Sequence, residues 1–137
     1  MALLGRVAEG RRRKLEEFLA SNLQPGETLQ ATLSMIETNN PAFLGILFTK
    51  FFGIGLTNER LYFVEWAKAV PERPQRVLGS VSRDAVKIGT WKRGLPLAQG
   101  TLVFEADDGN SIRLKVPGMH RDEAERIVEQ LSQAPAG

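Results

Sequence analysis

The sequence contains no cysteine, a single histidine and a net charge of only +2. Without cysteine there can be no disulfide, no thiolate nucleophile and no cysteine-bound zinc, and one histidine is too few for a multi-histidine metal site. Because basic and acidic residues nearly cancel, the net charge gives no reason to expect a nucleic-acid partner. We therefore expect no metal, no cofactor and no nucleic acid.

Long apolar runs are lacking as well. The most apolar window, residues 41–56, is interrupted by Lys50 and by glycines, and it falls short of the roughly 20 apolar residues that span a bilayer. The opening residues, Met1-Ala2-Leu3-Leu4, are soon followed by charges and are too short for the core of a signal peptide. These features favour a cytoplasmic protein.

Motifs for catalysis are absent from the sequence too. No nucleophile and base stand in a recognisable motif, and Gly53-x-Gly55 lacks the third glycine and the following helix of a phosphate-binding loop. His120 lies near the start of a predicted helix, where we expect a surface or capping role. The sequence thus predicts no catalytic residue and a protein that is not an enzyme.

What is present fits one globular domain, because 42% of the 137 residues are hydrophobic and 25% are charged. Apolar residues at three- and four-residue spacing predict one helix over residues 3–23 and another over residues 119–133. The run Arg11-Arg12-Arg13-Lys14 falls in the middle of the first helix, since the helix dipole disfavours cations at an N-terminus. It is either a solvated face or a contact for an anionic membrane or nucleic acid.

Alternation of apolar and polar residues predicts strands over residues 28–36, 75–82, 84–93, 101–106 and 111–116, and on both sides of the polar turn Thr57-Asn58-Glu59-Arg60. In the first strand Met35 is expected to face the core, and near residue 90 Trp91 is expected to face outward. Tyr62 and Trp66 form a second apolar face on their strand. We therefore expect them to meet another packed element.

Two segments are candidates for contact with a partner. Residues 42–52 are unusually apolar for a connection, with Leu47, Phe48, Phe51 and Phe52 around one cation, Lys50. This segment is either a buried strand or short helix over one end of the core, or an exposed loop that enters a membrane interface or docks on a partner. Trp91, Lys92 and Arg93 belong either to a protected edge strand or to a site for a phosphate-bearing ligand.

Three stretches carry a resemblance to a known superfamily: Gly55-Leu56-Thr57-Asn58-Glu59-Arg60-Leu61-Tyr62-Phe63, Val81-Ser82-Arg83-Asp84-Ala85-Val86 and Glu123-Ala124-Glu125-Arg126-Ile127-Val128-Glu129-Gln130-Leu131. They resemble the pleckstrin-homology (PH)-like superfamily, and within it the bacterial PH-domain and GRAM-like families. The resemblance implies an α+β fold, a PH-like barrel of about seven antiparallel strands capped by a C-terminal helix. It covers residues 25–133, with residues 1–24 as an extra N-terminal helix and residues 134–137 as a disordered tail.

Two hypotheses for function follow. Bacterial relatives resemble interaction or assembly modules, so the leading hypothesis is a non-enzymatic cytoplasmic module that binds a protein partner or a second copy of itself. In the alternative the protein binds membranes peripherally, with the apolar side chains of residues 47–52 in the interface. Lys50, Lys92, Arg93 and the basic run 11–14 then meet anionic headgroups.

Overall fold

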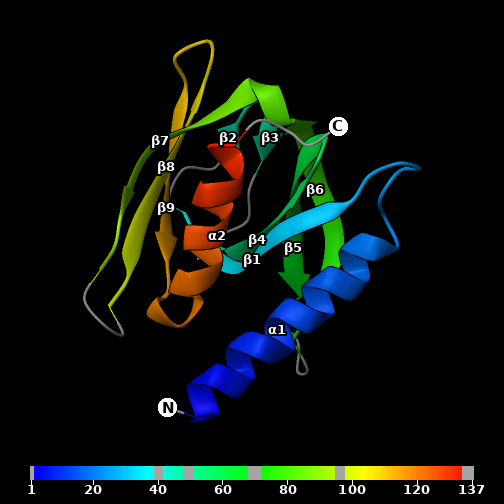
Figure 1. Cartoon of the computed structure of the whole chain (residues 1–137), viewed down its shortest axis with the longest axis vertical. Coiled ribbons are helices and arrows are strands. Elements are labelled where there is room, and N and C mark those ends of the chain that lie inside the picture. Colours follow the sequence, from blue (N-terminus) through cyan, green and yellow to red (C-terminus); the bar gives the residue numbers. More distant parts are fainter. Residues whose placement is uncertain (1, 39–41, 48–50, 68–71, 95–97, 134–137) are drawn as a thin grey trace.

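The structure, a computed structural model, describes residues 2–38, 42–47, 51–67, 72–94 and 98–133. It is an α+β fold in which seven antiparallel strands form one sheet in the order β6-β5-β4-β1-β9-β8-β7 (Figure 1). The elements are α1 (Ala2–Ala20), β1 (Leu29–Glu37), β2 (Ala42–Phe43), β3 (Ile46–Leu47), β4 (Phe51–Thr57), β5 (Arg60–Ala67), β6 (Arg73–Ser82), the short 3₁₀ turn η1 (Arg83–Ala85), β7 (Val86–Lys92), β8 (Gly100–Ala106), β9 (Ser111–Val116), the 3₁₀ turn η2 (Gly118–His120) and α2 (Arg121–Leu131).

The sheet is open rather than closed into a barrel, and this corrects the predicted barrel. Strands β6 and β7 stand at opposite ends of the strand order, and β1 meets β9 through a single residue pair, Glu37 with Lys115. The two halves of the sheet therefore diverge, and α2 lies between them in Figure 1. Its buried Ala124 and Ile127 join the main core, which confirms the predicted amphipathic second helix.

Helix α1 covers the other face of β4 and β5. Its Leu15 and Leu19 are buried against Tyr62 and Trp66, so the prediction that these aromatic residues meet a further packed element is confirmed. A Cβ on Gly55 would overlap the side chain of Leu19. Glycine at this position therefore lets the helix approach the sheet closely.

Partway along β1 the alternation of its side chains between the two faces of the sheet is interrupted. The pairing of β1 with β4 shifts register between Leu33 and Ile36, so Ile36 enters the main core while Met35 turns toward α1. Met35 is buried in a core cluster as predicted, but on the opposite face from Ala31 and Leu33, with which it was predicted to lie. The indole Nε1 of Trp66 donates a hydrogen bond of 2.6 Å to the carbonyl oxygen of Ser34, inside the irregular stretch. Such a bulge re-aims the side chains that follow it.

A second register shift explains why Trp91 does not face outward as predicted. It lies between Ile88 and Thr90 in the pairing of β7 with β8, and beyond it Trp91 packs against the main core and not outward. Strand β7 is nevertheless an end strand of the sheet, which confirms the edge-strand interpretation of this segment. Lys92 and Arg93 are exposed there, as expected for an edge protected by charge.

The chain that follows α1 is tied to the β4–β5 hairpin by Glu27. This fully buried carboxylate accepts hydrogen bonds from the Tyr62 hydroxyl at 2.5 Å and the Thr57 hydroxyl at 2.7 Å, and it pairs with Arg60 at 3.1 Å. Burial alone would raise the pKa of Glu27, but the hydrogen bonds, first of all from Tyr62, and the charge of Arg60 hold it below the ordinary glutamate value. The hairpin predicted at residues 57–60 is confirmed.

Residues 42–47 form a small hairpin of β2 and β3 that lies against the main sheet. Phe43 and Ile46 are buried in the main core, and Leu44 and Gly45 at the turn both have positive φ angles. The atoms of Ile46 fill the space beside Gly79 of β6. For this part of residues 42–52 the structure supports a buried strand over one end of the core.

Candidate functional site

An apolar cleft of about 480 Å³ opens between α1, the start of β4 and the end of β5. We call it the Trp66 cleft. Phe51 contributes to its lining and is 36% exposed. A concave apolar surface of this size is suited to an apolar side chain or a small apolar ligand. The apolar residues that line it are Met35, Phe51, Trp66, Ala67, Pro117 and Met119.

An ion pair crosses one side of the cleft. The Nε and Nη2 atoms of Arg11 donate to Oε2 and Oε1 of Glu72 at 2.9 and 3.0 Å, so the guanidinium holds the carboxylate through two parallel hydrogen bonds. The hydrogen bond from Arg11 lowers the pKa of Glu72 below its ordinary value. Lys14 also donates to the backbone oxygen of Glu72 at 2.8 Å. Helix α1 therefore fixes the residue that leads into β6.

A buried polar chain continues from Arg11 into the protein. Nη1 of Arg11 lies 3.1 Å from Nε2 of His120, and Nδ1 of His120 lies 2.9 Å from Oε1 of Glu123. Because a guanidinium can only donate, Nε2 must accept and Nδ1 carries the proton that is donated to Glu123. His120 is completely buried and makes no side-chain cap for α2. The expected surface or capping role of this histidine is therefore wrong.

Glu123 ends this chain on β1. Its Oε2 accepts hydrogen bonds of 2.9 Å from the hydroxyls of Thr32 and Ser34, and its Oε1 accepts one of 3.2 Å from the backbone N–H of Ser34. Glu123 lies in the first turn of α2, and its side chain joins the helix to the strand. Ser34 and His120 present no surface to solvent. The chain of contacts is thus placed to fix α1, α2 and β1 together.

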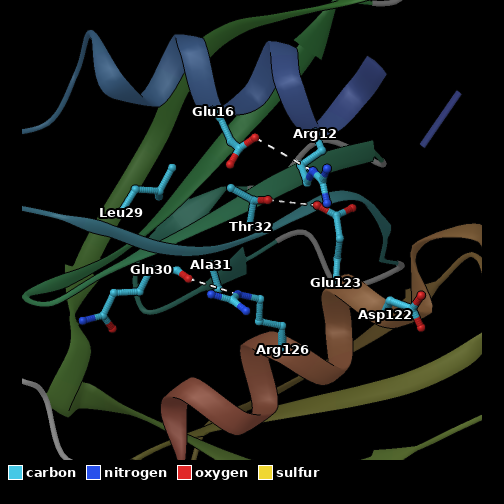
Figure 2. A pocket seen from close by; sticks show the side chains of 9 residues that line it. All are labelled: Arg12, Glu16, Leu29, Gln30, Ala31, Thr32, Asp122, Glu123 and Arg126. Carbon is cyan, nitrogen blue, oxygen red and sulfur yellow. Dashed lines mark hydrogen bonds and ion pairs between the residues drawn. The ribbon is translucent and has the colours of Figure 1, made fainter. Parts of the chain in front are cut away.

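A second hollow, of about 430 Å³, lies between α1 and α2 over the first residues of β1 (Figure 2). Arg126 from α2 donates to the backbone oxygen of Gln30 at 3.3 Å, and Arg12 lies 3.9 Å from Glu16 within α1. Side chains of both charges line this polar hollow, and most of them bond one another or the strand. The hollow therefore offers less to an external ligand than the Trp66 cleft does.

The predicted contact residues are not brought together as one surface. Phe51 is on the cleft, but Phe52 is fully buried in the main core and cannot contact a membrane. Leu47 ends β3, and its side chain, like Phe48 and Lys50, lies outside the described residues. Trp91, Lys92 and Arg93 belong to the β7 end of the sheet, four places from β4 in the strand order, and Arg93 pairs with Glu125 at 3.6 Å.

Most of the Trp66 cleft was not predicted from the sequence. Its residues come from α1, from three strands, from the residue before β6 and from η2 with the proline before it, and they are brought together only in the folded protein. Two predictions point to it: that Trp66 meets a packed element, and that Phe51 is a candidate for contact with a partner. No sequence motif identifies Arg11, Glu72 or Met119 as residues of a cleft.

Neither a metal site nor a transmembrane helix is found in the described part of the chain. No three histidine, aspartate or glutamate side chains gather there in a way that could hold a metal ion. No helix among the described residues is long and apolar enough to cross a membrane.

Comparison with known proteins identifies no family for this chain. No protein-family model matches the sequence, and no curated protein matches it. The chain is similar to the crystal structure of the C-terminal domain of an unknown protein from Leishmania infantum, with 17% sequence identity and a TM-score of 0.47. The similarity covers 91% of this chain and 98% of that one. At this identity it does not extend to function.

Proposed function

We propose that the protein is a non-enzymatic cytoplasmic binding module on a PH-like scaffold, and that it contacts a protein partner, or a second copy of itself, through the Trp66 cleft. The observation that carries the proposal is an apolar hollow of about 480 Å³ with the partly exposed Phe51 on its lining. Exposed apolar surface of this kind commonly marks a site of interaction. The PH-like scaffold is supported by antiparallel strands in two diverging halves with the C-terminal helix between them.

Rigidity of the cleft also supports this proposal. The bidentate pair of Arg11 with Glu72 and the buried contacts of His120 fix α1 against the residues that line the cleft. A hollow that is already formed binds more tightly than one that must be ordered during binding, because less conformational entropy is lost.

The proposal is tested by photo-crosslinking in cells that naturally contain the protein. A photoreactive phenylalanine analogue replaces Phe51 in one variant and the exposed Gln75 of β6 in a matched control. We expect a discrete protein adduct from position 51 and none from position 75. The mass of the adduct separates a second copy of the chain from a different protein. Absence of any protein adduct at position 51 would contradict the proposal.

Peripheral membrane binding is the second candidate. It is favoured by the closeness of exposed Phe51 to Arg11, since both line the same cleft and Arg11 is followed by three further cations along α1. Co-sedimentation with vesicles of phosphatidylcholine alone, and with added phosphatidylglycerol, tests it. Binding that needs the anionic lipid and is lost with Phe51→Ser would support this candidate. Crosslinks from position 51 to lipid would do the same.

A further inference from the structure

The Trp66 cleft is one half of a longer groove. A further hollow, of about 380 Å³ and distinct from the polar hollow of Figure 2, lies along α1 and is lined by Val7, Gly10 and basic residues. Arg11 and Glu72 line both hollows, so their ion pair stands between them. Val7 and Phe51, 37% and 36% exposed, are the large apolar side chains most open to solvent among the described residues, and each lies in one hollow. We call the two hollows together the α1 groove.

The Val7 end of the α1 groove carries uncompensated positive charge. Arg6 and Lys14 line it and are exposed, and neither forms an ion pair within the described part of the chain. Glu72 is the acidic residue that lines this hollow, and its carboxylate is already held by two hydrogen bonds from Arg11. A negatively charged group would therefore be attracted to this end of the groove.

The surface of α1 is bare at the centre of this charged hollow. Nothing lies within 4 Å of the position that a Cβ on Gly10 would occupy. Glycine in the interior of a helix costs roughly 0.5–1 kcal/mol relative to alanine, and at this position it leaves the helix backbone uncovered by a side chain. The groove thus combines an apolar hollow, a stretch of open helix backbone and two exposed cations, of which Lys14 also donates to the backbone oxygen of Glu72.

We propose that the α1 groove binds an acidic linear segment of a partner protein. A large apolar side chain of that segment occupies the Trp66 cleft, and its Asp or Glu side chains lie beside Arg6 and Lys14. The inference rests on the proposed function and deepens it by naming the chemistry of the partner. A concave hollow accepts a side chain from a partner, whereas insertion into a bilayer requires apolar groups that project from the surface.

Selection from a displayed library of random linear peptides on the immobilised full chain tests this inference. We expect enriched peptides to contain one large apolar residue together with Asp or Glu. Their binding should be lost with Phe51→Ser and weakened about tenfold or more by the pair Arg6→Glu and Lys14→Glu, and it should fall with added salt. The control pair Lys92→Glu and Arg113→Glu makes the same change in net charge at exposed positions elsewhere and should leave binding unchanged.

The outcomes separate this inference from the proposed function. Peptides without acidic residues, whose binding needs Phe51 but is indifferent to Arg6→Glu and Lys14→Glu, would overturn the inference and leave the proposed function standing. Peptides that bind independently of Phe51, or no enriched peptide at all, would overturn the inference and also remove the Trp66 cleft as the site of the proposed function. Circular dichroism on each variant confirms that it is folded before its binding is compared.

Discussion

The two halves of α1 meet the rest of the protein in opposite ways. In the C-terminal half, Leu15 and Leu19 are completely buried, and Gly55 on the sheet leaves the room that Leu19 fills. In the N-terminal half, Val7 is exposed and the space beside Gly10 is open. The same helix is therefore anchored by close packing at one end and presents a groove at the other. The anchored half supplies the stability that allows the other half to remain accessible.

The largest expected effect lies in the anchored half. Leu19→Ala removes a fully buried side chain beside Gly55 and leaves a cavity, so we expect it to lower the free energy of unfolding by about 2–5 kcal/mol. Urea denaturation followed by tryptophan fluorescence measures this, since Trp66 belongs to the same buried cluster. A loss below about 1 kcal/mol would mean that α1 is not anchored through this residue.

Glu27 anchors the chain just after α1. We expect its replacement to have the second-largest effect on the free energy of unfolding. Glu27→Gln removes the charge that Tyr62, Thr57 and Arg60 surround, and we expect a loss of about 1.5–3 kcal/mol at neutral pH.

The same residue gives a pH dependence with a defined sign. Because the pKa of Glu27 is lower in the folded protein than its ordinary value, its contribution is complete above the unfolded-state pKa and is lost as pH falls through the folded-state pKa. The difference in unfolding free energy between the wild type and Glu27→Gln should therefore shrink below the ordinary glutamate pKa, roughly 4.3. A difference that stays constant into strong acid would show that the carboxylate is not stabilised in this way.

Gly55→Ala is expected to have a smaller effect on the free energy of unfolding, and the direction of that effect is the test. Without a clash, replacing glycine at a permitted φ angle stabilises a protein by about 0.4–1 kcal/mol. Here the added Cβ overlaps Leu19, so we expect a loss of about 1–3 kcal/mol instead. A double-mutant cycle with Leu19→Ala sharpens the test, because the substitution should cost much less once Leu19 is shortened. Additive losses would place the strain elsewhere.

The smallest effect is expected in the open half. Val7→Ala changes an exposed side chain on the same helix as Leu19, and we expect the free energy of unfolding to change by less than about 0.5 kcal/mol. Thermal unfolding of Val7→Ala and Leu15→Ala side by side makes the comparison, since both shorten an apolar side chain of α1. Equal losses in the two variants would contradict the division of the helix into an anchored and an open half.

The sequence predicted those features that depend on local patterns. Alternating residues identified most strands of the main sheet, and the turn at residues 57–60 was placed correctly, because the side chains and backbone preferences that form it are close in the chain. The helices were also predicted, although α1 ends at Ala20, three residues before the predicted end. Helix ends are less well determined by periodicity than helix centres.

Features that depend on distant residues were not predicted. Met35 faces α1 because a register shift interrupts the alternation of β1, and the bond from Trp66 to Ser34 within it joins residues 32 positions apart. His120 was misplaced because its burial depends on Arg11, 109 positions away. The open sheet was missed for a similar reason, since the single strand-pairing position between β1 and β9, Glu37 with Lys115, joins distant parts of the chain. No local pattern contains this information.

The close fit between Leu19 and Gly55 has a consequence for the order of events during synthesis. Helix α1 is synthesised before β4 and β5, which form part of the surface that buries it. A helix of 19 residues containing Gly5 and Gly10 has little stability without a partner. Helix α1 therefore acquires its final structure only after β4 and β5 have been made, and until then its apolar face is not covered by them.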